Sequence, residues 1–332
     1  MGHPRLASVA VCLLLLAGTL GAGSRAVRLD LLSDGNAASP DDGFGTSVAI
    51  CDINADGVGD IIVGSPRNDS AGSNAGAVYI FLGRSTLAQG RLSPANASFV
   101  LTGPMNDSLF GASVAAAGDW NGDSRADLLV GAPGYNQSRG AAFLFLGSRP
   151  SNGTALSANV TVLGPTPGGR LGASVAGAGD LNGDGLDDIA CGAPGAPWNG
   201  EVRVFFGQRL SGAVMIPDLA ADATVRGPRA AGFGSSVVGA GDLNGDGDGE
   251  LAVAGKDDRV FIYYGSGSFA DDFRLHITNV TAASQNQSDD TLQDIGNLQA
   301  SDDFYYVVMQ GRTMFLEDFP GAGMNGTIHS AQ

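Results

Sequence analysis

The stretch from Gly43 to Pro66, GFGTSVAICDINADGVGDIIVGSP, decides the fold because the chain repeats it. Three further copies follow: LFGASVAAAGDWNGDSRADLLVGAP from Leu109, RLGASVAGAGDLNGDGLDDIACGAP from Arg170 and GFGSSVVGAGDLNGDGDGELAVAGK from Gly232. The copies recur about every 60 residues and contain only short apolar runs, which is typical of the blades of a β-propeller. We therefore expect an all-β protein.

Each copy is expected to form one four-stranded blade. In the second copy, short apolar runs bounded by Gly, Pro, Asn or Asp predict strands over residues 112–117, 127–130, 142–146 and 159–163. A fainter fifth copy at 296–316 indicates about five blades, the fifth degenerate. In this alignment residues 273–277 form the outermost strand of the fourth blade. Residues 27–31 would complete the last blade if the ring closes, which would hide the sheet edges.

The N-terminal residues differ from the rest of the chain. Arg5 precedes an apolar run from Leu6 to Leu20, and small residues follow, which predicts a signal peptide at 1–26. No later stretch approaches the roughly twenty apolar residues of a membrane span. We assign 27–332 to the propeller, with repeats at approximately 27–83, 99–147, 159–207 and 223–265 and a degenerate one at 273–316.

The composition is rich in glycine and in acidic residues. The chain has 52 glycines and a formal net charge of -16, and Lys256 is its one lysine. This charge argues against a nucleic-acid partner, because binding to a phosphate backbone depends on Lys and Arg. The acidic surplus has two interpretations: a well-solvated surface, or carboxylates gathered around cations.

The positions of the acidic residues favour cations. In the loop between the first two predicted strands of each copy, acidic or amide side chains occupy positions 1, 3, 5 and 9. These residues are Asp52, Asn54, Asp56 and Asp60; Asp119, Asn121, Asp123 and Asp127; Asp180, Asn182, Asp184 and Asp188; and Asp242, Asn244, Asp246 and Glu250. Hard oxygen ligands at this spacing, with a backbone carbonyl near position 7, match the coordination that Ca²⁺ prefers.

One such loop by itself has another interpretation, an Asx-rich turn. Four copies favour calcium, and we expect about four sites. The fourth copy is the least regular, since Asp248 is an additional acid and Glu250 replaces Asp. The fifth copy has Asn297, Gln299 and Ser301 at the first three positions and is not expected to bind calcium.

Asparagine sequons support secretion independently. Acceptor sequences for N-glycosylation occur at Asn68, Asn96, Asn106, Asn136, Asn152, Asn159, Asn279, Asn286 and Asn325. Chance in loops rich in Ser, Thr and Asn is the alternative. We expect a secreted or cell-surface glycoprotein. Cys51 and Cys191 lie on predicted strands of different repeats, so we expect buried thiols rather than a disulfide.

Short motifs in the repeats resemble a known family. The Phe-Gly pairs at Phe44, Phe110 and Phe233, with the Gly-Ala-Pro triplets at Gly131 and Gly192, resemble the FG-GAP repeat of the integrin alpha-subunit N-terminal β-propeller. The resemblance implies calcium in the hairpin loops on one face and protein ligands at the opposite face. We take the phenylalanines themselves to be core residues.

The chain also departs from that pattern. Leu171 replaces Phe in the third copy, the triplet of the first copy is Gly64-Ser65-Pro66, and that of the fourth is Ala254-Gly255-Lys256. The seven repeats, leg and membrane helix of integrin subunits are not evident. Signalling as a receptor is therefore not implied by the resemblance.

The favoured function is an adhesion or protein-interaction module with an extracellular protein or glycan ligand. Sequons crowd the ligand-facing loops of the first two repeats, so we place a partner patch at Arg170, Trp198 and Arg229, although Trp198 instead capping the blade core is the alternative. Other interpretations are the propeller of an extracellular hydrolase resembling glycosylphosphatidylinositol phospholipase D, or a piece of a larger seven-repeat receptor. We do not expect an enzyme, because the chain after the signal has only His276 and His329.

Overall fold

The structure is a computed structural model that describes part of the chain. The described residues are 28–29, 41–83, 91–147, 151–197, 199–210, 219–227, 232–256, 259–267 and 269, and strands at 275–280, 296–301, 304–309, 312–316 and 324–331. The predicted signal peptide at 1–26 lies outside them. Among the helices that are described, none is long and apolar enough to cross a membrane.

Four sheets carry the four repeats, and their strands are antiparallel except for the parallel pair of β10 and β6. The first contains β2 (Ser47–Cys51), β3 (Asp60–Ser65), β4 (Ala77–Phe81) and β6 (Phe99–Thr102), with short β10 (Gly153–Thr154) beside β6. The second contains β7 (Ser113–Gly118), β8 (Asp127–Ala132), β9 (Ala141–Phe145) and β11 (Val160–Leu163). The third contains β12 (Ser174–Gly179), β13 (Asp188–Ala193), β14 (Glu201–Phe205) and β15 (Ala223–Arg226). The fourth contains β16 (Ser236–Gly241), β17 (Glu250–Ala254) and β18 (Val260–Tyr264).

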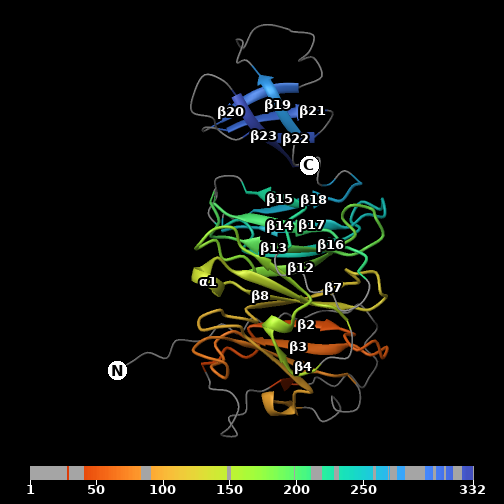
Figure 1. Ribbon diagram of the computed structural model, residues 1–332. Coiled ribbons are helices and arrows are strands. Elements are labelled where there is room, and N and C mark those ends of the chain that lie inside the picture. The colour runs from red at the N-terminus through yellow and green to blue at the C-terminus, as the bar shows by residue number, and fades with distance from the viewer. Residues whose placement is uncertain are drawn as a thin grey trace.

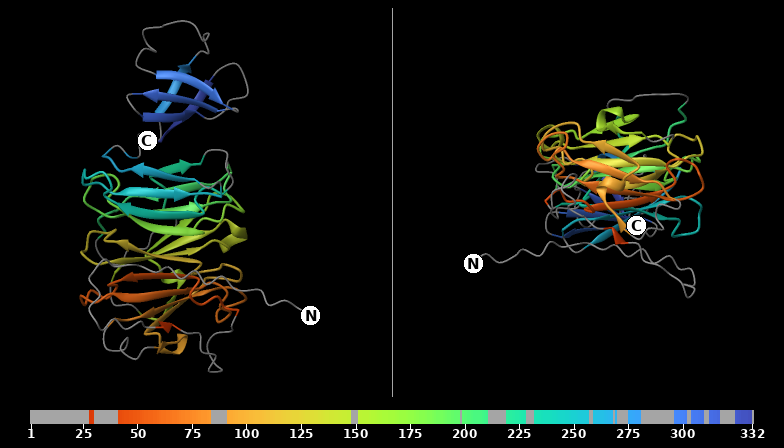
Figure 2. Two further views of the ribbon diagram at one scale, coloured as in Figure 1. Left: turned by 180° about the vertical axis from the view of Figure 1, so that it is seen from behind. Right: turned by 90° about the horizontal axis from the view of Figure 1, so that it is seen from below.

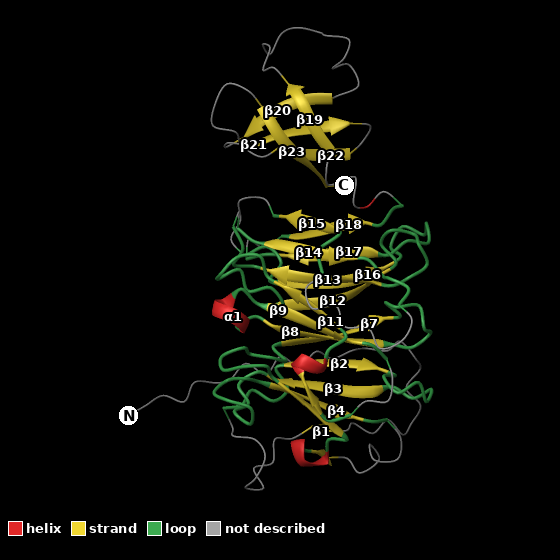
Figure 3. Cartoon of the chain, viewed as in Figure 1, coloured by secondary structure: helices red, strands yellow, loops and turns green. Residues whose placement is uncertain are grey.

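These sheets are the blades of a β-propeller, and they lie side by side in chain order. Their first strands, β2, β7, β12 and β16, contact one another in succession (Figure 1). Figure 2 shows the same order from behind and from below. The helical segments are short, for example α1 (Tyr135–Ser138) and the 3-10 turns η2 (Pro94–Asn96) and η3 (Ala155–Ser157) (Figure 3). The predicted all-β propeller is confirmed.

The repeated glycines form the seams between neighbouring blades. A Cβ atom on Gly131, in the Gly-Ala-Pro triplet of the second repeat, would lie 2.1 Å from the carbonyl oxygen of Gly172. Gly172 is the Phe-Gly glycine position of the third repeat. The Ser113 hydroxyl donates a hydrogen bond of 2.8 Å to the same carbonyl. Glycine at these motif positions therefore allows the backbones of two neighbouring blades to approach closely.

The same seam joins the other neighbouring blades. Gly64 and Ser47 meet Gly111, and Gly192 and Ser174 meet Gly234. The high glycine content is explained in part by these contacts.

The aromatic residues of the motifs fill the core, as predicted. Phe110 and Phe233 are fully buried, and Phe110 packs edge to face with Phe143 at 5.7 Å between ring centroids. Phe44 is half-buried and makes a similar contact with Tyr79. The replacement Leu171 occupies the equivalent buried position. Pro133 and Pro194 directly follow β8 and β13, which end at Ala132 and Ala193.

The two cysteines outside the predicted signal are buried free thiols, as predicted. Burial raises the pKa of both Cys51 and Cys191 to about 12, so neither thiol is reactive at neutral pH.

Two predicted strand pairings are wrong. The N-terminal strand, β1 (Arg28–Leu29), pairs in parallel with β5 (Arg91–Leu92) instead of completing the last blade. The strand predicted at 273–277 is described only from Leu275, where β19 (Leu275–Val280) pairs with β23 (Met324–Ala331) instead of with the fourth blade. The sequence patterns found a strand in each region, but the choice of edge partner is a tertiary property.

The sheet containing β19 and β23 includes the degenerate fifth copy. Its order is β19, β23, β22 (Arg312–Leu316), β21 (Phe304–Met309) and β20 (Gly296–Ser301). β21 and β22 occur where the fifth copy predicts strands. β20 is a strand over residues that the alignment places in the calcium-loop segment, and β23 was not predicted.

Candidate metal centre

The predicted ligands lie in four equivalent hairpin loops. Each loop joins the first and second strands of a blade, at the opposite end of the blade from the connection that holds α1 (Figure 3). We call them loops 1 to 4 for residues 52–60, 119–127, 180–188 and 242–250.

Loop 3 shows the local geometry. The Asp180 carboxylate accepts hydrogen bonds from the backbone N–H groups of Asp184 at 3.0 Å and Gly185 at 2.7 Å. Asn182 donates from its amide to the Asp184 carboxylate at 3.0 Å. Positions 1, 3 and 5 are therefore mutually close. The corresponding contacts of loops 1 and 2 join Asp52, Asn54 and Asp56, and Asp119, Asn121 and Asp123.

The carboxylates at position 9 of loops 1 to 3 are buried and doubly hydrogen-bonded. Asp188 accepts one bond from the N–H of Leu181 and one from the N–H of Gly207, each 2.8 Å long. Asp60 and Asp127 bind the matching backbone groups of their own blades. These carboxylates tie each loop to the end of the blade's third strand.

Burial also changes the acidity of these groups. It raises the pKa of Asp127 and of Asp188 to about 7, although the backbone N–H donors act in the opposite direction. The pKa of Asp60 is also raised, again mainly because of burial. A nearby cation would favour the ionised form of all three.

Loop 4 brings its acidic groups closest together. Carboxylate oxygens of Asp242, Asp246 and Glu250 all lie within 4.8 Å of one another, and in the described part of the chain no other such group of three was found. Glu250 is fully buried; its Oε2 accepts a bond from the Leu243 N–H, whereas its Oε1 has no hydrogen-bond partner among the described residues. A buried carboxylate oxygen without a partner is costly, and a bound cation would satisfy it.

The ligand set fits calcium. It consists of hard carboxylate and amide oxygens, which is the donor type that Ca²⁺ takes in six to eight positions. Asn244 lies in this set because its amide contacts Asp246 at 2.7 Å. The loop that the sequence makes least regular thus has the most convergent carboxylates.

Loops 2 and 3 are linked across the blade boundary. The Asp187 carboxylate accepts a 2.7 Å hydrogen bond from the N–H of Asp119, the first residue of loop 2. In addition, Gln208 donates to the carbonyl of Trp120, and Ser266 to that of Leu181. Loops 2 and 3 are therefore supported by the following blade. Nothing in the sequence analysis singled out Asp187, because no other copy has an acid at position 8.

The sequons divide into exposed and buried ones. Asn96, Asn106, Asn136 and Asn152 are exposed, and Asn159 is partly buried. Asn68 is only 3% exposed, and its amide nitrogen, the atom that would carry a glycan, donates to the Asp42 carboxylate at 2.9 Å and to the Tyr79 hydroxyl at 3.2 Å. The side chains of Asn279, Asn286 and Asn325 are outside the described residues.

The predicted partner patch is described at one of its three positions. Arg170 is exposed in the loop after β11, with a left-handed backbone at φ 59°. Trp198 and Arg229 lie outside the described residues.

The seam serines were missed by the sequence analysis. Ser47, Ser113 and Ser174 each bridge to the next blade. Their signal was present, since a serine stands two residues after the Phe-Gly glycine position in every copy.

Comparisons with known proteins agree with the repeat. The family model for the FG-GAP repeat matches residues 44–81, 110–145 and 171–205. Mouse integrin alpha-IIb is 42% identical over 164 residues, which cover 46% of this chain and 15% of that protein. Integrin alpha-PS5 of Drosophila melanogaster is 34% identical, over 46% of this chain and 15% of its own length. Mouse integrin alpha-X is 32% identical, over 60% of this chain and 16% of its own length. The match thus spans less than a fifth of each relative.

Proposed function

Because this chain is an FG-GAP repeat protein that resembles the integrin alpha subunits, we propose that it is an extracellular calcium-binding propeller that acts as an adhesion or protein-interaction module. The single observation that carries the calcium part is loop 4, where the Glu250 Oε1 is buried without a partner beside Asp242 and Asp246. Repetition of the same ligand pattern in loops 1 to 3 supports about four sites.

In loop 4, calcium would be held by Asp242, Asn244, Asp246 and Glu250. The ion would supply the positive charge that three converging carboxylates lack, and it would close the hairpin onto β17. In loops 1 to 3, the ligands would come from positions 1, 3, 5 and 9. Calcium therefore acts in this proposal as a structural brace rather than as a catalyst.

The partner would bind at the end of the blades away from the calcium loops. Connections between elements carry most binding functions when a rigid scaffold positions them. Arg170 is exposed at that end, and Trp198 and Arg229 are proposed to lie with it. The ligand is an extracellular protein or glycan. Secretion by the signal at 1–26 is part of the same proposal.

Calcium binding is tested by thermal unfolding. For a site with a Kd of about 0.1 to 1 mM, calcium at ten times the Kd adds about 1.4 kcal/mol per site. Four sites together should raise Tm by at least about 10 °C over the EDTA sample, and Mg²⁺ should do so less well because it demands octahedral geometry. A Tm that is the same in calcium and in EDTA would rule out the calcium proposal.

The interaction function needs a separate experiment. The purified protein is immobilised and exposed to extracellular material in calcium or in EDTA, and the retained proteins are identified. We expect a partner retained in calcium that is lost for Arg170→Glu and kept for Arg67→Glu, an exposed arginine in the first blade. If Arg170→Glu retained the partner as well as the unmodified protein does, the partner site would have to lie elsewhere.

Glycosylation is proposed at the exposed sequons and not at Asn68. A glycan on the Asn68 amide would have to break its bonds to Asp42 and Tyr79. Peptide mass spectrometry of the secreted protein should find glycans at Asn96, Asn106, Asn136 or Asn152 and an unmodified Asn68. Full occupancy of Asn68 would contradict this assignment.

A further inference from the structure

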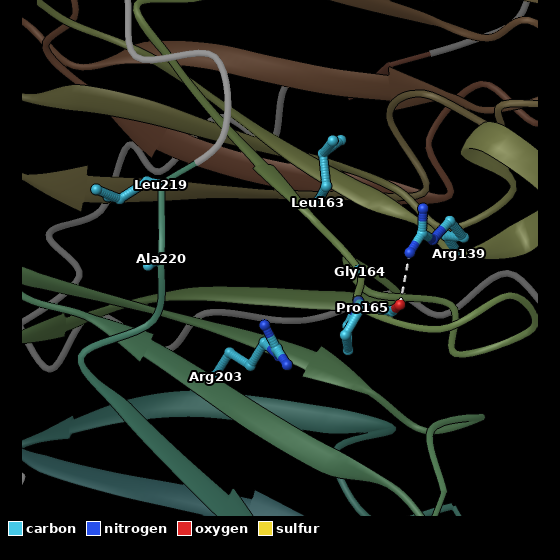
Figure 4. Close-up of a pocket in the computed structure, with 7 residues that line it drawn as sticks. All are labelled: Arg139, Leu163, Gly164, Pro165, Arg203, Leu219 and Ala220. Carbon is cyan, nitrogen blue, oxygen red and sulfur yellow. Dashed lines mark hydrogen bonds between the residues drawn. The ribbon is translucent and has the colours of Figure 1, made fainter.

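A pocket of about 310 Å³ lies between the second and third blades, away from the calcium loops. Arg139 and Leu163 reach it from the second blade, and Arg203 and Leu219 from the third, with Pro165 on its wall (Figure 4). The Leu219 N–H donates to the Thr161 carbonyl at 3.0 Å, so the two blades are joined beside the pocket.

Arg139 has unused hydrogen-bonding capacity there. Its Nη2 donates to the Pro165 carbonyl at 2.6 Å, which fixes the guanidinium against the pocket wall. Its Nε is buried and has no hydrogen-bond partner among the described residues. A buried donor without an acceptor is rare in folded proteins.

Arg203 presents a second guanidinium from the facing blade. Its Nε donates to the Glu201 carboxylate at 2.8 Å, and the side chain extends from β14 toward Leu163 and Pro165 in Figure 4. No bond from its two terminal nitrogens to a described residue is present. The Nε of Arg226 also lies 3.9 Å from Oε2 of Glu201, so this one carboxylate faces two arginines.

The pocket is positive and otherwise apolar. None of the described residues that line it is acidic, although the chain as a whole has a net charge of -16. The remaining wall is formed mainly by Leu163, Pro165 and Leu219. Planar guanidinium groups match carboxylate and sulfonate oxygens, while the apolar wall suits a hydrocarbon group. Its volume is at the lower limit for small-molecule sites, so the ligand must be small.

We propose that this pocket binds a small organic anion, in which a carboxylate or sulfonate group contacts Arg139 and Arg203 and a small apolar group contacts Leu163 and Leu219. The proposal does not depend on the adhesion function or on the identity of a protein partner.

The test uses benzoate and benzenesulfonate as probes, with neutral benzyl alcohol as the matched comparison. Binding to the full chain is followed by ligand-observed NMR titration with calcium present throughout. We expect saturable binding of at least one anion, and binding of benzyl alcohol at least about tenfold weaker, because charge-assisted hydrogen bonds are the stronger kind. Arg139→Gln and Arg203→Gln should each weaken binding of the anion at least about tenfold.

Arg67→Gln is the control, since Arg67 is exposed in the first blade and does not line the pocket. The affinity of Arg67→Gln for the anion should equal that of the unmodified protein. Should Arg139→Gln unfold because the Pro165 contact is lost, Arg203→Gln decides the result. No binding of either anion at 20 mM overturns the proposal, and so does equal binding of benzyl alcohol. Binding that is unchanged in both variants also overturns it, because the anion is then held elsewhere, for example by calcium.

Discussion

The third and fourth repeats share an identical segment, GAGDLNGDG, at residues 177–185 and 239–247, but its surroundings differ. Leu181 in the third repeat is fully buried, whereas Leu243, at the same place in the fourth, is 58% exposed. Leu181 is covered by the following blade, which also binds its carbonyl through Ser266. The difference shows that the neighbouring blade, and not the local sequence, decides whether this position belongs to the core.

The repeats diverge just after that segment, and three of the differences bear on the calcium loop and on the seam. Asp188 becomes Glu250, Gly192 becomes Ala254 and Pro194 becomes Lys256. A Cβ on Gly192 would lie 2.0 Å from the Gly234 carbonyl oxygen, so a following blade cannot approach Ala254 as closely as the fourth blade approaches Gly192. Ala254 therefore explains why the regular seam ends at the fourth blade.

The largest contrast is expected for the two leucines. Leu181→Ala removes a fully buried side chain and should lower the free energy of unfolding by about 3 kcal/mol, whereas Leu243→Ala should change it by less than about 0.5 kcal/mol. Urea unfolding in calcium measures both. Equal losses would mean that Leu243 is covered as Leu181 is, and the contrast between the repeats would disappear.

The seam glycine should give the next largest effect. Gly192→Ala places a methyl group against a backbone carbonyl that cannot move without shifting the fourth blade, at a cost of about 2 to 3 kcal/mol. The reverse change in the fourth repeat, Ala254→Gly, should cost no more than about 1 kcal/mol, the usual penalty of glycine in a strand. If the two variants were equally stable, close backbone approach would not be what holds neighbouring blades together.

Calcium affinity at loops 2 and 3 should depend on pH. Because burial raises the pKa of Asp127 and Asp188 to about 7, protons compete with calcium below that pH. In Glu250→Gln, which weakens loop 4, the Kd of loops 2 and 3 should be about tenfold higher at pH 6 than at pH 8, equivalent to about 1.4 kcal/mol. Calorimetric titration at the two pH values provides the measurement.

The stability of the calcium-free protein should change in the opposite sense. A carboxyl whose folded-state pKa is raised holds its proton more tightly in the folded chain, so this contribution is present at low pH and is lost as the pH rises from about 4 to 7. A Kd independent of pH, or calcium-free stability that increases across this range, would show that these carboxyls are ionised throughout.

The contrast also marks how far sequence reasoning reaches. Strand positions such as the one predicted at 127–130, which lies within β8, and the loops with acids at alternate positions followed from local spacing, because period and turn residues are local properties. Burial of Leu181 but not Leu243 could not follow, since the two lie in identical sequence. The partners of β1 and β19 were wrong, and the pocket between Arg139 and Arg203 was missed, because both depend on segments far apart in the chain.

The smallest contrast is expected for the seam serines. Ser174 donates a 2.8 Å hydrogen bond to the Gly234 carbonyl of the next blade, whereas Ser236, its counterpart in the fourth repeat, is exposed. Ser174→Ala should therefore cost about 1 kcal/mol of unfolding free energy, and Ser236→Ala almost nothing. Both serines lie at the same position of the first strand of their blade, so strand propensity cancels between the two variants. A loss in Ser236→Ala as large as that in Ser174→Ala would show that the hydroxyl acts within its own blade, and the seam would then rest on the glycine contacts alone.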